Sequence, residues 1–255
     1  MSATSFTFEP LFLVLAAAAG AAYVRAARSD PPPAWRAACF GCGLLLVAAP
    51  LNSPLETIAA HYLLLIHLLQ NALIADIAPL LVLLGLTPVM RDALSRHGAA
   101  RIRPRWVLPV WLLAWYGTHM APFYDWALRT GWGLNVEHLI LVGAGLLFWW
   151  PIVSGRLSAP AGLAYLGVAF VGSSFLGLAY VFSSSAFYSF YERAPRLWGL
   201  SPVRDQNLGG ILMNGEQTIV FLLAIGWFVL RLLDEEHEAA SAPAASAADG
   251  SPARG

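Results

Sequence analysis

The chain has little charge and no lysine. Charged residues make up 12% of its 255 residues, and all 15 cationic residues are arginines. A soluble domain carries about a quarter charged residues, so this composition excludes a disordered chain and disfavours a water-soluble globule. The formal net charge is zero, so the composition does not favour non-specific electrostatic binding to nucleic acid. The two cysteines are too few for a disulfide framework.

Hydrophobic residues make up 58% of the chain, and they come in long blocks. A helix needs about 20 apolar residues to cross the hydrocarbon core of a bilayer. The candidate spans lie at about 10–24, 35–50, 58–86, 105–120, 134–153, 161–183 and 209–233. Because each span must satisfy its own backbone in lipid, we expect an all-α, polytopic membrane bundle of about seven transmembrane helices.

The arginines are concentrated in alternate loops. Arg25, Arg28 and Arg36 separate the first two spans, and five more arginines lie between 91 and 105. Arginine-rich loops stay in the cytoplasm, so we expect the N-terminus outside, the C-terminus inside and a multi-pass protein of the cell membrane. The bundle is expected to occupy residues 1–237, and the Ala/Ser/Pro-rich segment 238–255 is expected to be a disordered tail.

Several ionisable or sulfur-bearing residues fall at the same outer leaflet in this topology. They are His67, His119, Met120, His138, Asp205 and Met213. Imidazole and thioether together suit copper, and imidazole with carboxylate also suits zinc or iron. We predict that His67, His119 and His138 form the centre of a metal or proton site, adjoined by Met120, Met213 or Asp205. The alternative is that each histidine only bridges neighbouring helices.

Other polar residues have two interpretations each. Asp76 either caps a broken turn before Pro79 or relays protons. Cys39 and Cys42 share one helical face, where they either pack as small apolar residues or act in copper or redox chemistry.

Two features flank the predicted histidine site. His61 lies roughly 120° around the helix from His67, so we expect it to face elsewhere. The aromatic and charged segment 122–129 predicts a short interfacial helix, which is either a lid over the histidines or an ordinary turn.

Several blocks of the sequence are similar to one known family. They are His67–Gln70, Pro79–Gly85, His119 with Pro122 and Tyr124, Glu137–His138 with Phe148–Pro151, and Asp205–Gly210. Over roughly residues 55–236 the chain resembles the CtaG-like family of cytochrome c oxidase assembly proteins. Its members are multi-span membrane proteins associated with copper supply to terminal oxidases.

One position departs from the family pattern. Members commonly show His-x-x-Gln-His in the third span, whereas this chain has Asn71 at the second histidine. Asparagine is a poor copper ligand. The site therefore uses fewer histidines, or Asn71 is not itself a ligand but orients one through a hydrogen bond, or this branch of the family does not bind metal.

The resemblance implies a chaperone-like assembly factor that helps copper delivery or insertion at the outer face of the membrane. Copper is the suspected ligand, and the expected partners are the lipid bilayer and a terminal oxidase subunit or another copper-handling protein. A transporter of metal ions or small solutes is one alternative, which needs polar residues below His67, such as Asp76. A ligand-free scaffold that docks an oxidase subunit is another. We expect no enzyme, because no nucleophile–base pair stands out.

Overall fold

The computed structural model describes residues 2–241, and every regular element in this range is a helix. The elements of the first half are α1 (Pro10–Ala27), α2 (Ala34–Leu51), α3 (Pro54–His61), α4 (Leu64–Ala72), the π-helical turn η1 (Leu73–Ile77), α5 (Ala78–Gly85), α6 (Pro88–Arg96) and the 3-10 turn η2 (Ala99–Arg101). The second half contains α7 (Pro104–Thr118), α8 (Ala121–Arg129), α9 (Gly133–Val153), α10 (Ala159–Phe182), α11 (Ser189–Arg193) and α12 (Pro202–Ser241). The all-α prediction is confirmed.

Six helical units of the described chain are long and apolar enough to cross a membrane. They are α1, α2, the continuous unit from α4 through η1 to α5, α9, α10 and α12. The remaining predicted span, 105–120, corresponds to α7, whose 15 residues are shorter than the roughly 20 that a bilayer requires. The count of seven spans and the orientation of the termini therefore stay predictions.

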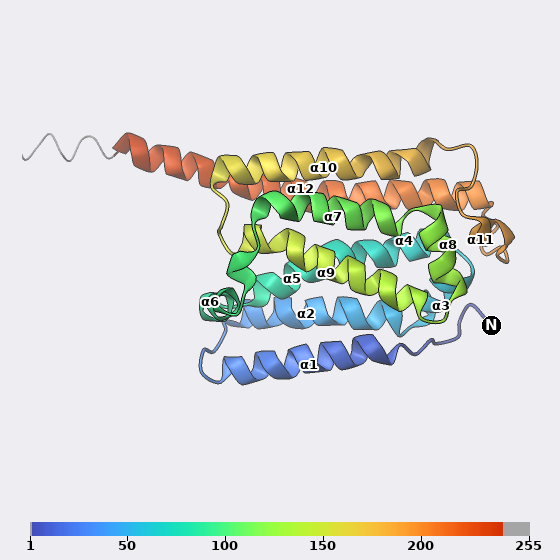
Figure 1. Cartoon of the computed structure of the whole chain (residues 1–255), viewed down its shortest axis with the longest axis horizontal. Coiled ribbons are helices and arrows are strands. Elements are labelled where there is room, and N and C mark those ends of the chain that lie inside the picture. Colours follow the sequence, from blue (N-terminus) through green and yellow to red (C-terminus); the bar gives the residue numbers. More distant parts are fainter. Residues whose placement is uncertain (1, 242–255) are drawn as a thin grey trace, which may run out of the picture.

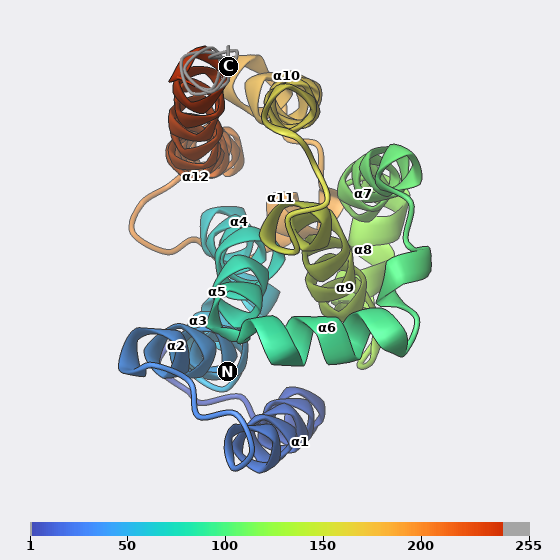
Figure 2. The same cartoon turned by 90° about the vertical axis from the view of Figure 1, so that its left-hand side faces the viewer.

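The long helices run side by side along one axis of the molecule (Figure 1). Seen along that axis, α4–α5 and α9 lie in the middle, and α1, α2, α7, α10 and α12 surround them (Figure 2). Burial agrees with this view, since 61% of the α4–α5 window is buried inside the protein but only 11% of the α1 window. α1 is the most loosely packed of the spanning helices.

The predicted third span, 58–86, is two separate helical units. α3 ends at His61, and a new helix begins at Leu64. The break is stabilised by Asp205 of α12, whose two carboxylate oxygens accept the backbone amides of Leu64 and Leu65 at 2.8 and 2.9 Å. A carboxylate from the far end of the chain thus caps α4 and satisfies two of its free N–H groups.

The chain does not break at Pro79. Residues Leu73–Ile77 form a π-helical turn instead, and the helix continues as α5. Proline cannot donate a backbone hydrogen bond, and local widening of the helix accommodates that loss. Gly145 of α9 packs against this turn so closely that a Cβ atom there would overlap the carbonyl oxygen of Ala75. The absence of a side chain at Gly145 is what lets α9 reach the turn.

Two further boundaries bear on the sequence-based ranges. α8 is the short helix predicted for residues 122–129. α12 begins at Pro202 and continues to Ser241, so it includes the first four residues of the predicted tail. The rest of that tail, residues 242–255, lies outside the described residues.

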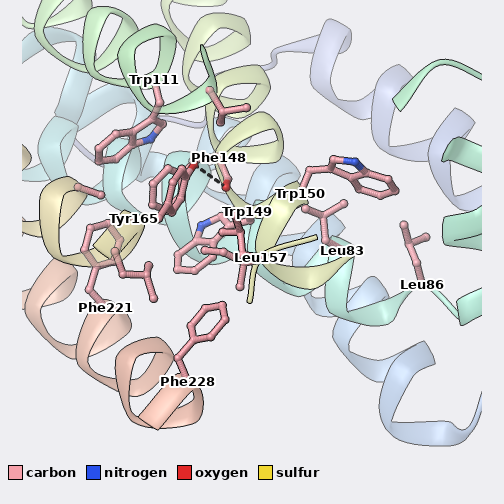
Figure 3. Close-up of a cluster of buried hydrophobic side chains, with 14 of the residues drawn as sticks. Leu83, Leu86, Trp111, Phe148, Trp149, Trp150, Leu157, Tyr165, Phe221 and Phe228 are labelled. Carbon is pink, nitrogen blue, oxygen red and sulfur yellow. Dashed lines mark hydrogen bonds between the residues drawn. The ribbon is translucent and has the colours of Figure 1, made fainter. Parts of the chain in front are cut away.

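An aromatic core holds α7, α9, α10 and α12 together toward the end of the bundle that carries α6. The rings of Trp111 and Phe148 stack with centroids 4.4 Å apart. The Tyr165 hydroxyl donates to the carbonyl of Phe148 at 3.0 Å (Figure 3). Phe221 and Phe228 of α12 complete this cluster. It fixes the helices at one end, while the polar residues gather toward the other.

Candidate functional site

His67, Glu137 and His138 lie close together, near the starts of α4 and α9. Figure 1 shows α3, α8 and α11 at one end of the bundle. His67 comes from α4, and the other two come from the start of α9. The His67 and His138 rings have centroids 6.0 Å apart and are nearly perpendicular. Nε2 of His67 is 3.3 Å from Oε1 of Glu137. All three side chains are buried, so this is an enclosed polar group within an apolar bundle.

The hydrogen bonds around His67 determine which of its ring nitrogens carries the hydrogen. The Tyr191 hydroxyl donates to the carbonyl of Ala59 at 2.5 Å. A hydroxyl has one hydrogen to donate, so in the 2.9 Å contact between Tyr191 and Nδ1 of His67 the imidazole is the donor. With the hydrogen on Nδ1, Nε2 is directed at Glu137. That contact is favourable when Nε2 carries either a second proton or a metal ion.

His119 is held close to this group through Tyr124. Its Nδ1 lies 2.7 Å from the carbonyl of Trp115 and donates to it, which leaves Nε2 as a free acceptor. The ring of Tyr124, from α8, has its centroid 4.7 Å from that of His67 and 5.9 Å from that of His119. The Tyr188 hydroxyl donates to the His119 carbonyl at 2.8 Å. A buried tyrosine therefore contacts both imidazoles.

The three predicted imidazoles share one feature. The Nε2 atoms of His67, His119 and His138 are buried and make no hydrogen bond among the described residues. Nε2 of His67 nevertheless has a polar neighbour, because Oε1 of Glu137 lies 3.3 Å away. Oε2 of Glu137 also makes no hydrogen bond among these residues. Imidazole nitrogen and carboxylate oxygen are the donors that copper, zinc and iron use, so the chemistry of this group fits a metal ion.

The geometry is not that of a closed metal centre. Across residues 2–241, no group of three or more histidine, cysteine, aspartate or glutamate side chains is arranged so that it could hold a metal ion. The donors are present but are not drawn together around one point.

Asn71, at the position where the family commonly has histidine, contacts the group through Glu137. Its Nδ2 donates at 3.0 Å to the Oε1 atom that also faces His67. This arrangement favours the second of the three alternatives for Asn71, that of a positioning residue. The next polar residue, Gln70, donates at 3.0 Å to Oε2 of Glu56. Burial raises the pKa of Glu56 to about 7, although the charge of His67 and the Gln70 hydrogen bond both oppose the rise.

The residues predicted to adjoin the imidazoles have other surroundings. Both carboxylate oxygens of Asp205 are engaged in capping α4. Met213 is fully buried in an apolar cluster with Leu68 and Trp115. Met120 precedes α8 and is 59% exposed. The metal-site prediction therefore depends on the imidazoles, together with Glu137.

Other sequence features lie apart from this group. His61 belongs to α3, a different helix from His67, which explains why the two face different surroundings. Cys39 is half-buried and Cys42 is exposed on α2, both as free thiols. Sequence reasoning placed Glu137 next to His138 but did not include it in the candidate metal site, and it missed Tyr191 as the hydrogen-bond partner of His67. The adjacency of Glu137 and His138 was a usable signal, whereas Tyr191 comes from a loop helix and gave none.

The comparison with protein families gives one match. Residues 17–235 match the family described as cytochrome c oxidase caa3 assembly factor (Caa3_CtaG). The matched range includes His67, His119, Glu137 and His138. No curated protein and no solved structure matches the chain.

Proposed function

The chain belongs to the cytochrome c oxidase caa3 assembly factor family, and we propose that its part in assembly is to deliver copper to an oxidase subunit at the outer face of the cell membrane. Copper is then a cargo that arrives and leaves, and not a resident cofactor. The partner is the oxidase subunit that receives it.

The observation that carries this proposal is that the buried Nε2 atoms of His67, His119 and His138 make no hydrogen bond among the described residues. Those of His119 and His138 have no partner, and that of His67 faces only the carboxylate of Glu137 at 3.3 Å. A buried polar atom without a partner costs about 1–3 kcal/mol. A cluster of them is therefore explained best by a ligand that accepts their lone pairs. Glu137 adds a negative charge that favours a cation. No thiolate takes part, so copper would be held through imidazole and released more readily than from a cysteine site.

The site needs an opening, because all three imidazoles are buried. His138 packs edge-on against Phe12 of α1, with centroids 5.9 Å apart. Tyr124 of α8 covers His67. α8 is a short helix at the end of the bundle, and α1 is loosely packed. We propose that displacement of α8 or α1 gives copper access to the imidazoles.

Oxidase activity in cells tests this proposal. His67→Ala and His138→Ala should lower the activity of the copper oxidase, and added copper should restore part of it. His61→Ala, a histidine on α3 away from the group, is the matched control and should leave activity unchanged. Normal oxidase activity in both variants would refute delivery by this site. Loss that copper does not rescue would favour the ligand-free scaffold.

A further inference from the structure

A second polar group lies deeper in the bundle than the imidazoles. Asp76 is in the π-helical turn, near the middle of the Leu64–Gly85 span. Gln217 of α12 donates through Nε2 to Oδ2 of Asp76 at 3.4 Å. Both side chains are fully buried. The neighbouring residue on α12 is Glu216, whose carboxyl group interacts electrostatically with that of Asp76.

This group has many acceptors and one donor. Oδ1 of Asp76, both carboxyl oxygens of Glu216 and Oε1 of Gln217 are buried without a hydrogen-bond partner among the described residues. The unpartnered amide oxygen of Gln217 is an observation separate from the two acids, and it points to the same place. Four oxygen atoms thus lack a positively charged or hydrogen-donating neighbour.

Among residues 2–241, no cationic side chain forms an ion pair with Asp76 or Glu216. The ion pairs of the described chain join His67 to Glu137, Arg129 to Asp125 and Arg231 to Glu235. The helices that pack against the turn, α2, α4, α5 and α9, carry Arg36, His67, Glu137 and His138 as their charged or histidine side chains. None of the ion pairs or hydrogen bonds of the described residues joins one of these side chains to Asp76. Bare carboxylates in such a place cost several kcal/mol each, so the charge must be balanced from outside the chain.

We propose that Asp76, Glu216 and Gln217 form a second site that takes up an exchangeable cation through oxygen atoms, either a proton or a hard metal ion. Carboxylate and amide oxygens bind hard cations, whereas copper in transfer proteins prefers imidazole and sulfur. The two sites therefore differ in ligand chemistry as well as in depth. The π-helical turn supports the assignment, because single π turns inside α-helices are frequent at functional sites.

Two measurements on the full chain in lipid nanodiscs distinguish the two cations. Infrared difference spectra from about pH 5 to about pH 9 detect the C=O band of protonated carboxyl groups. The band changes only for carboxyl groups that gain or lose a proton in this pH range. Titration with Mn²⁺, followed by electron paramagnetic resonance, detects a hard metal ion. Every protein in this comparison carries Glu56→Gln, because burial raises the pKa of Glu56 to about 7 and its carboxyl band would change in the same pH range. In this background the variants are Asp76→Asn and Glu216→Gln, and the control is Asp92→Asn, an exposed acid on α6.

A carboxyl band that changes with pH in the Glu56→Gln protein and the control, but not in the two variants, supports the site with a proton as its cation. Saturable Mn²⁺ binding that weakens about tenfold or more in both variants supports it with a metal ion. A pH-independent carboxyl band together with no saturable Mn²⁺ binding overturns the proposal. If Asp76→Asn fails to fold, the Glu216→Gln variant alone tests the proposal. It should fold, because the carboxyl group of Glu216 makes no hydrogen bond that holds helices together.

Discussion

His67 and Glu137 face each other across 3.3 Å, and this contact joins α4 to α9 inside the candidate site. Asn71 donates to the same carboxylate oxygen at 3.0 Å. Asn71 is therefore placed where it can orient Glu137 toward His67.

Substitution of Asn71 tests this positioning role. Asn71→Ala removes the hydrogen bond to Glu137 and should weaken copper binding about 10-fold to 100-fold, as loss of a residue that orients a ligand does. Asn71→His restores the family pattern and should strengthen copper binding, because it adds an imidazole. Copper titration of the purified variants measures both. Equal affinity in Asn71→Ala and the natural protein would contradict the role.

Asp205 should act in stability and not in metal binding. Asp205→Asn keeps the side chain's size but weakens the cap on α4, so it should destabilise the protein by about 1–2 kcal/mol. Because both carboxylate oxygens are used by Leu64 and Leu65, copper affinity should stay within about twofold. Thermal unfolding and copper titration give the two readings. A large loss of copper affinity at unchanged stability would contradict this prediction and would indicate that Asp205 is a copper ligand.

Gly145 should tolerate no side chain. Gly145→Ala places a methyl group against the Ala75 carbonyl in the π-helical turn and should cost about 1–3 kcal/mol through overpacking. A methyl group at Gly143, on the same helix, would meet no neighbouring atom within 4 Å, so Gly143→Ala is the matched control. The melting temperature in nanodiscs should fall for the first variant only. An equal effect on both would mean that helix propensity, and not the close approach, governs this position.

Glu56 should make stability depend on pH. Burial raises its pKa in the folded protein from 4.5 to about 7, so the folded state binds more protons than the unfolded state between these values. Stability should therefore fall as the pH rises from about 4.5 through about 7, by about 3 kcal/mol for the full shift. Glu56→Gln should be less sensitive to pH and more stable than the natural protein at about pH 8.

The exposed acid Glu192 provides the comparison for that titration. Glu192→Gln on α11 should leave the pH profile of the melting temperature unchanged. An identical profile in Glu56→Gln and the natural protein would mean that the buried carboxyl does not control it.

The sequence predicts most of the helices, because a spanning segment must be apolar along its whole length. The block at 134–153 agrees with α9 to within one residue. The block at 58–86 was wrong as a single helix, since its apolar run continues through the break at Tyr62 and Leu63. The break is stabilised by Asp205, and a cap supplied by a distant helix leaves no local pattern.

The sequence indicated which histidines lie at the same end of the bundle, but not the direction in which their side chains point. Counting residues along each span placed His67 and His138 at the same end of the bundle, where the structure has them. It could not give the rotation of α9, which brings Glu137 rather than a thioether to His67. Glu216 was missed for a related reason, because one acid in a long apolar block barely changes its hydropathy, and its nearness to Asp76 depends on how α12 packs.

Copper binding by the purified protein tests the central claim most directly. Titration of the natural protein with copper against a competing chelator should show saturable binding. Affinity should fall at least about tenfold in His67→Ala and in His138→Ala, and it should be unchanged in His61→Ala. Absence of saturable binding, or equal affinity in all four proteins, would contradict a copper-handling role for these imidazoles.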